Sequence, residues 1–392
     1  MTMSTDSRRI AAIEYTGIGP WGFVTVTTED GLAGTGQSGY FMYPDTAVPI
    51  IDALRDALVG EDANRIGRIA AKAHRTTPFR GGALMSTVAA IDLALWDLKS
   101  KRYEVPACEL IGGAHRDRVR LHVLLGMSDW PATSTVESLA SEAAKWVAEG
   151  FTAVKFDPLL EGDDGYARQS YSAMIASVVD VVAVIRDTVG TGVDIALEIH
   201  RKLGVAEATA LADELRPFRI FMYEDSIPPD SLDSLGDVAN NVLVPVGAGE
   251  RQDSIYEFRE LLQRGGTEYV RPDVGTAGGL TNCVKIAALA EAHHRRVIAH
   301  NFVSPYLTAA TLQLYAAVPN VGTFEWSPRD EVEPGSLLLD TPIDREGGFI
   351  NISSAPGLGH AIAHDAAERI GSFERIRPGA FPTELDGSLR LR

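Results

Sequence analysis

Three glutamates follow short apolar runs at equal spacing along the chain. Glu198, Glu224 and Glu250 are separated by 26 residues in both intervals. That length accommodates one strand, one helix and two loops, so each glutamate is expected at the carboxyl end of a consecutive parallel strand. A single glutamate after an apolar run is commonly a solvated loop residue. Three that meet at one barrel mouth would repel one another unless a cation lay between them, and all-oxygen ligands favour Mg²⁺ or another hard divalent ion. The spacing therefore predicts one Mg²⁺ per subunit, bound by these three residues.

Two histidines stand beside these carboxylates. On one continued strand, Glu198 and His200 would share a face with Cα atoms roughly 6.6 Å apart. His300 ends the run 297–299 and would face Asp273, which ends the neighbouring strand. A carboxylate bonded to one ring nitrogen fixes the tautomer and makes the other nitrogen more basic, which suits a general base. A buried structural His–Asp pair is the alternative interpretation.

Other strand ends also carry ionisable residues. Lys155 and Asp157 lie at the end of the second strand, and Glu325 lies on the eighth. Lys155 could balance the carboxylates, act as an acid or base, or stabilise an enolate, while Asp157 should bond to or neutralise a neighbour. Neither Cys108 nor Cys283 falls at a strand end, which disfavours a cysteine nucleophile.

Alternating patterns predict the elements that position these residues. Strand-like runs lie at 121–125, 152–156, 194–199, 219–224, 244–248, 268–272, 297–300 and 322–326. Helical patterns lie between them near 135–149, 169–188, 205–215, 231–239, 254–264, 281–295 and 304–317. Eight strands alternating with seven helices predict a parallel α/β barrel.

The segments on either side of the barrel form a second unit in this prediction. Residues 10–40 read as a β-meander, followed by helices near 46–59 and 63–74. Ser86 is expected to cap a long buried helix that runs to about Lys101. We expect an α+β N-terminal capping domain at 1–120, a catalytic barrel at 121–330, and a Pro- and Gly-rich segment at 331–392 that returns to the capping domain.

The composition limits the possible partners and compartment. The formal net charge is −17, which argues against nucleic-acid or anionic-membrane binding because both need a basic face. The presence of only two cysteines in the sequence argues against a disulfide framework and fits a reducing compartment. Residues 1–9 lack the apolar core of a signal peptide, and no apolar run is long enough to span a membrane. A cytoplasmic protein is expected.

Aromatic residues near the N-terminus are candidates for substrate contacts. Residues 40–45 are aromatic and lie beside glycine, so they form either a packed surface loop or a flap that closes over a substrate. Trp21, Tyr40 and Tyr43 are the residues expected to contact the substrate there.

The chain resembles the enolase superfamily, in its mandelate racemase-like group, over nearly its whole length. The motifs are residues 90–98 (AIDLALWDL) before Pro106 and Gly112-Gly113, Glu224-Asp225, Gly249-Glu250, Arg271-Pro272-Asp273 with Gly278-Gly279, and Pro356-Gly357-Leu358-Gly359. The resemblance implies a capping domain on a modified (β/α)₇β TIM-type barrel. It also implies Mg²⁺ held by the three glutamates, and abstraction of a proton α to a carboxylate with metal stabilisation of the enediolate.

Within this family the site is most similar to acid-sugar dehydratases of the galactonate, gluconate and mannonate type. The resemblance implies that His200 is the general acid for the departing hydroxyl and that His300 is the base. It departs from the usual pattern in three places: Glu198 stands where Asp is usual, Asp225-Ser226 replaces Glu-Pro, and Lys202 stands where Arg is frequent. Asp157 and Lys202 are assigned to substrate binding.

These observations predict a Mg²⁺-dependent hydro-lyase that converts an aldonate-type sugar acid to a 2-keto-3-deoxy acid. Lys155 would help stabilise the enediolate, and Glu325 would bond to it or to the substrate carboxylate. A racemase or epimerase of a 2-hydroxy acid on the same scaffold is the alternative. A non-catalytic member that binds a metal or a sugar acid is a third interpretation. A homo-oligomer is expected.

Overall fold

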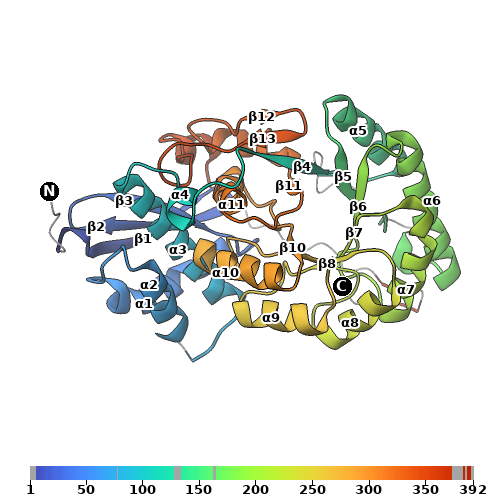
Figure 1. The fold of residues 1–392 in the computed structure, drawn as a ribbon, viewed down its shortest axis with the longest axis horizontal. Helices are drawn as coiled ribbons and strands as arrows, with labels where there is room; N and C mark the ends of the chain where they lie inside the picture. The colour runs from blue at the N-terminus through green and yellow to red at the C-terminus, as the bar shows by residue number, and fades with distance from the viewer. Residues whose placement is uncertain are drawn as a thin grey trace.

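The computed structural model of the chain describes residues 6–76, 78–127, 134–161, 165–372, 383–384 and 386–389. Figure 1 shows a small α/β unit built from the N-terminal elements at one side and a larger ring of strands and helices at the other. Within the described residues, no helix is both long and apolar enough to cross a membrane.

A parallel barrel forms the larger unit. Over the described part of the chain, its eight strands are β4 (Arg118–Leu124), β5 (Ala153–Phe156), β6 (Asp194–Glu198), β7 (Met222–Glu224), β8 (Val246–Ala248), β9 (Tyr269–Val270), β10 (Arg296–Val297) and β11 (Phe324–Trp326). Each strand from β4 to β10 pairs in parallel with the next, and β11 pairs in parallel with β4. A bridge between Val297 and Val321 closes the ring between β10 and β11.

Helices alternate with these strands, as the sequence patterns predicted. They are α5 (Val136–Ala148), α6 (Tyr171–Val189), α7 (Val205–Glu214), α8 (Leu232–Asn241), α9 (Ile255–Arg264), α10 (Gly279–Ala292) and α11 (Pro305–Ala317). Short 3₁₀ turns are η1 (Asp6–Arg8), η2 (Pro44–Thr46), η3 (Tyr166–Arg168), η4 (Arg216–Phe218), η5 (Pro328–Asp330) and η6 (Gly335–Leu337). The α/β class and the (β/α)₇β barrel with an N-terminal cap are confirmed.

The cap consists of an antiparallel sheet and the helices packed on it. Its strands are β1 (Ile10–Ile18), β2 (Trp21–Thr28) and β3 (Ala33–Ser38), and its helices are α1 (Ala47–Leu58), α2 (Ile66–Thr76), α3 (Gly82–Arg102) and α4 (Ala107–Ile111). The predicted start of the long helix was wrong: α3 begins one turn earlier, and Ser86 is buried inside it. Leu84 and Met85 are buried in that first turn, so apolar packing extends the helix past the Ser capping signal.

The cap covers the carboxyl ends of the barrel strands, which we call the barrel mouth. Gly39 N donates a hydrogen bond to Gly275 O at 2.9 Å, just beyond β9. Beyond β10, the Tyr306 hydroxyl donates to Thr35 O at 2.7 Å. These contacts hold β3 against the loops in which polar strand-end residues lie.

The C-terminal segment contacts both units. β12 (Arg345–Glu346) and β13 (Phe349–Asn351) form a hairpin, and β13 pairs antiparallel with the start of β4. Leu358 N donates to the Asp97 carboxylate of α3, and the residue after α12 (Ala366–Ile370) accepts from Gly19 N. This segment therefore returns to the cap and also extends the barrel sheet; the domain limits at 120 and 330 remain predictions.

A close approach of α3 to β3 gives a test of the cap. A Cβ at Gly36 would meet Ala90 O at 2.0 Å and Ala94 N at 2.6 Å, which are backbone atoms that cannot move aside cheaply. Gly36→Ala should therefore destabilise the protein by about 1–3 kcal/mol or more, as overpacking does. The matched control is Gly67→Ala on α2, where a Cβ meets nothing within 4 Å, and which should keep or raise stability. Thermal unfolding of both variants is the measurement, and equal melting temperatures would contradict the packing argument.

Candidate active site

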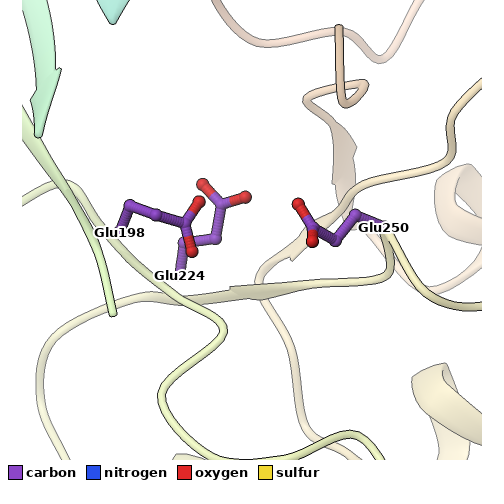
Figure 2. Close-up of side chains that lie close together, drawn as sticks. All are labelled: Glu198, Glu224 and Glu250. Atoms are coloured by element: carbon purple, nitrogen blue, oxygen red, sulfur yellow. The ribbon is translucent and has the colours of Figure 1, made fainter. Parts of the chain in front are cut away.

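Three glutamates converge at the barrel mouth. Glu198 ends β6, Glu224 ends β7, and Glu250 follows β8. Figure 2 shows their carboxylates directed toward one another, with Glu250 approaching from the side opposite to the other two. One carboxylate oxygen from each lies within 4.8 Å of the others. Oxygens around Mg²⁺ bound at about 2.1 Å lie about 3–4 Å apart, so small side-chain movements would bring this hard-oxygen set to that geometry. The residues fit a divalent cation.

Two buried cations lie beneath the glutamates. The Lys155 ammonium donates to Glu198 at 3.1 Å, to Glu224 at 2.7 Å and to Glu325 at 2.5 Å. The Arg271 guanidinium is fully buried, contacts Glu224 and donates to Glu325 at 2.5 Å. Burial lowers the pKa of Lys155, but these carboxylates outweigh it and raise that pKa above its ordinary value. Lys155 thus lies among three carboxylates and balances part of their negative charge.

The cluster distributes its negative charge unevenly. Burial, with the neighbouring Glu198 charge, raises the pKa of Glu224 well above its ordinary value, although Arg271 opposes the shift. Burial also raises the pKa of Glu198, but Lys155 and His200 outweigh it and leave that pKa below its ordinary value. Because part of this charge is uncompensated by protein cations, a divalent ion would relieve the repulsion.

His300 and Asp273 form one imidazole–carboxylate pair at the mouth. His300 Nδ1 lies 2.6 Å from Asp273 Oδ2, and Asp273 Oδ1 accepts from Gly275 N at 2.6 Å. The other ring nitrogen, Nε2, points to Glu250 at 3.5 Å. Burial lowers the pKa of His300, but Glu250 and Asp273 together raise it above its ordinary value. The predicted pairing of His300 with Asp273 is present, with a second nitrogen facing the glutamates.

His200 and Asp157 form a second such pair. His200 Nδ1 lies 2.7 Å from Asp157 Oδ2, and the same oxygen accepts from Lys202 Nζ at 2.7 Å. Lys202 also donates to Leu159 O at 3.1 Å and is buried. Burial lowers the pKa of His200, and Glu198 with Asp157 raises it overall. Asp157 and Lys202 therefore support the imidazole from behind, rather than standing free at the mouth.

The backbone around His200 differs from the expected strand. β6 ends at Glu198, and His200 and Arg201 have φ values of +52° and +65°. Asp225, after β7, also has a left-handed backbone at φ +43°. Such conformations are costly for residues other than glycine and persist where the surroundings hold them. Here Arg201 N donates to Asp225 O at 2.7 Å. His200 therefore lies in a turn after β6, and not on the same strand face as Glu198.

Several charged residues of the site were not predicted. The Arg201 side chain donates to Asp225 at 2.8 Å and to Glu250 at 2.7 Å, and its turn conformation hides it from a strand pattern. Arg271 lies two residues before Asp273, a spacing that could have placed it on the same inward face. His122 is buried on β4 with Nε2 3.5 Å from Glu325, and burial lowers its pKa to about 4.

Glu325 and the aromatic candidates take different positions. Both Glu325 oxygens bind protein groups, Oε1 the Asn301 N–H and Oε2 the buried cations. The Trp21 indole donates to Val303 O at 2.7 Å and is buried at the cap–barrel contact. Tyr40 and Tyr43 lie together in the cap loop, with ring centroids 6.1 Å apart, and Tyr43 is 41% exposed. Among the three aromatics, Trp21 is buried, Tyr40 is partly buried and Tyr43 is the most exposed.

Comparison with known families places this site. Residues 10–112 match the N-terminal domain of the mandelate racemase / muconate lactonizing enzyme family, and residues 138–366 match the enolase C-terminal domain-like family. The chain belongs to the enolase superfamily. The N-terminal match falls on the cap and the C-terminal match falls on the barrel.

Individual relatives cover nearly the whole of this enolase-superfamily chain. A D-galactonate dehydratase of Xanthomonas campestris pv. campestris is 34% identical over 355 residues, which cover 89% of this chain and 90% of the relative. One from Ralstonia pickettii is 33% identical over 345 residues, which cover 86% of this chain and 88% of the relative. The crystal structure of a putative dehydratase from Zymomonas mobilis ZM4 aligns with TM-score 0.87 at 28% identity, covering 92% and 97% of the two chains.

Lys155 offers a test of the charge balance in this enolase-superfamily site. Lys155→Met should destabilise the metal-free protein by about 3–5 kcal/mol, because it leaves buried carboxylates without their cation. Added Mg²⁺ should recover part of that loss by supplying positive charge to the same oxygens. The control is Lys72→Met, which breaks a surface ion pair with Glu61 worth about 0–1 kcal/mol. Unfolding in EDTA and in Mg²⁺ measures both; an equal loss in the two variants, unchanged by Mg²⁺, would refute the assignment.

Proposed function

We propose that this protein is a Mg²⁺-dependent dehydratase of an aldonate-type sugar acid. It would remove the C2 proton and the C3 hydroxyl to give a 2-keto-3-deoxy acid. The observation that carries the proposal is the pair of imidazoles at the mouth of a barrel with converging carboxylates, each imidazole bonded through Nδ1 to its own aspartate. Relatives named D-galactonate dehydratase support the same reaction class.

His300 is assigned as the general base. Asp273 holds its Nδ1 at 2.6 Å and so fixes the tautomer, which leaves Nε2 as the nitrogen that takes a proton. Nε2 faces the glutamate cluster, where a carboxylate substrate held beside the cation would present its α-carbon. The proton removed from C2 therefore goes to His300 Nε2.

His200 is assigned as the general acid. Asp157 Oδ2 holds its Nδ1 at 2.7 Å, which leaves Nε2 as the nitrogen that donates a proton. Asp157 is fixed by Lys202 and by Leu159 N, which donates to Asp157 Oδ1 at 2.9 Å. The proton from His200 joins the C3 hydroxyl, and this oxygen leaves as water. The resulting enol tautomerises to the 2-keto acid.

The three glutamates would hold Mg²⁺, which supplies Lewis-acid stabilisation of negative charge on the substrate carboxylate. Lys155 and Arg271 hold these glutamates in place from below. Glu325, bound to both cations, is assigned to this support. The proposal also includes a cytoplasmic location and a homo-oligomeric state. The low cysteine content supports the first of these.

A racemase or epimerase is the second candidate, and one observation favours it. The His200–Asp157 pair has the same Nδ1-to-carboxylate arrangement as the His300–Asp273 pair, so either imidazole is oriented to exchange a proton. With a substrate that lacks a leaving group at C3, such a pair could return a proton to C2 instead of expelling water. Product analysis for 2-keto acid distinguishes the two reactions.

Metal binding through the glutamates can be tested without a substrate. Mg²⁺ should raise the melting temperature of the wild-type protein, because an ion that binds only the folded state stabilises it by mass action. Glu224→Gln should abolish most of this increase, since it removes a charged ligand from the centre of the cluster. Glu346→Gln, an exposed change on β12, should leave it intact. Metal-dependent stabilisation that survives in Glu224→Gln would rule out this metal site.

The two histidines should have separable effects on turnover. His200→Asn should reduce dehydration by about 10²–10⁴-fold while exchange of the C2 hydrogen in deuterated water persists. His300→Asn should abolish exchange and dehydration together, because no base then removes the proton. Both variants should keep the Mg²⁺-dependent rise in melting temperature.

NMR of C2 exchange, beside an assay of 2-keto acid, measures these effects on an acid-sugar substrate found by screening. Exchange that persists in His300→Asn but not in His200→Asn would reverse the assigned roles. Exchange by the wild type without any 2-keto product would favour the epimerase.

A further inference from the structure

The cap touches the proposed base through aromatic rings. Phe302 follows β10 and packs edge-on against His300, with ring centroids 5.1 Å apart and an interplanar angle of 67°. Phe41, in the cap loop after β3, packs edge-on against Phe302 with centroids 5.1 Å apart and an angle of 64°. A continuous line of three rings thus joins the cap to the imidazole.

The same cap segment reaches the partner of His300 through the backbone. Gly39 N donates to Gly275 O at 2.9 Å, and Gly275 N donates to Asp273 Oδ1 at 2.6 Å. The approach is close: a Cβ on Gly39 would lie 2.8 Å from Gly275 C, and a Cβ on Gly275 would lie 2.8 Å from Gly39 Cα. The cap therefore contacts the loop after β9 at Gly275, the residue whose N–H binds the Asp273 carboxylate.

We propose that the cap segment 39–41 is a positioning element for His300, acting through Phe41 and Phe302 on the ring and through Gly39 and Gly275 on Asp273. The orientation of this histidine then depends on both domains. His200 is held differently, because its partner Asp157, and Lys202 which donates to Asp157, both come from the barrel. The two imidazoles of one site should therefore respond differently to changes in the cap.

A barrel-only explanation of the geometry is weaker. Asp273 alone fixes Nδ1 but leaves the ring free to rotate about that bond, and the Phe302 edge limits this rotation. Phe302 in turn has Phe41 against it. An error of about 1 Å in placing a catalytic group can lower a rate by about 10²-fold, so such support has kinetic weight.

The first test observes the imidazoles directly and needs no substrate. Ring nitrogen and ring proton NMR signals of the histidines are recorded in metal-free protein with labelled histidine, and His200→Asn and His300→Asn assign the two signals. Phe41→Ala is the informative variant, because Phe41 packs on Phe302 and Phe302 is the ring against His300. Its expected effect is a shift or broadening of the His300 signals with the His200 signals unmoved.

Three further variants keep the test independent of a folding defect. Phe41→Tyr, which keeps the ring, should restore the wild-type His300 signals. Gly39→Ala should also move the His300 signals, through the Gly275 and Asp273 backbone. Tyr103→Ala, at the far end of α3, removes an exposed cap aromatic and should change neither histidine. Unmoved His300 signals in Phe41→Ala, or equal movement of both histidines, would overturn the proposal.

The second test is kinetic and rests on the proposed function. On an acid-sugar substrate, Phe41→Ala and Phe302→Ala should lower kcat for C2 exchange about 10- to 100-fold with little change in KM, and Phe41→Tyr should recover most of it. A rise in KM alone would mean that Phe41 contacts substrate and does not position the base. If no acid sugar reacts while the NMR shift is present, the proposed function fails and the positioning role stands.

Discussion

The site depends on one buried ammonium. Lys155 lies among three glutamates from different strands, and the contacts of Arg271 extend the same network to β9. Unpaired, such carboxylates would be expelled to solvent or protonated; paired, they can be held together under the mouth. The cations thus allow the barrel to keep a buried, oxygen-rich carboxylate cluster in the folded state. That concentration of carboxylate oxygens is what makes a divalent ion the fitting occupant.

Much of the architecture was predictable because it follows periodic rules. Alternating apolar runs and helical patterns predicted eight strands and seven helices, and equal spacing of Glu198, Glu224 and Glu250 predicted that they would meet. Parallel strands bring their carboxyl ends to one end of the barrel, so residues at equivalent strand ends lie close together in space. The start of α3 could not be predicted, because burial of Leu84 and Met85 outweighs a local capping signal.

The site residues that the sequence did not predict lie mainly in turns beyond the strands, where the alternating pattern ends. Arg201 and Asp225 are in left-handed conformations just beyond strands, and no alternation rule gives the direction of their side chains. Lys202 was assigned to substrate binding from the resemblance, and no pattern in the sequence indicated its hydrogen bonds to Asp157 and Leu159. His122 lay inside an apolar run, where its contact with Glu325 depends on the β4–β11 pairing. Long-range partners of this kind require the closed barrel.

The close packing of α3 on β3 has a consequence for how such a protein could acquire new substrates. With Gly34 and Gly36 seated against the helix backbone, neither position can take a side chain without moving α3 away from the sheet. Variation is then channelled into the loop that leaves β3, whose tip carries the exposed Tyr43 while its base is tied to the barrel at Gly39. A change at the tip meets solvent, whereas a change near the base meets Gly275 and, through it, Asp273. Diversification of substrate range and conservation of reaction would in this way be separated by only a few residues of one loop.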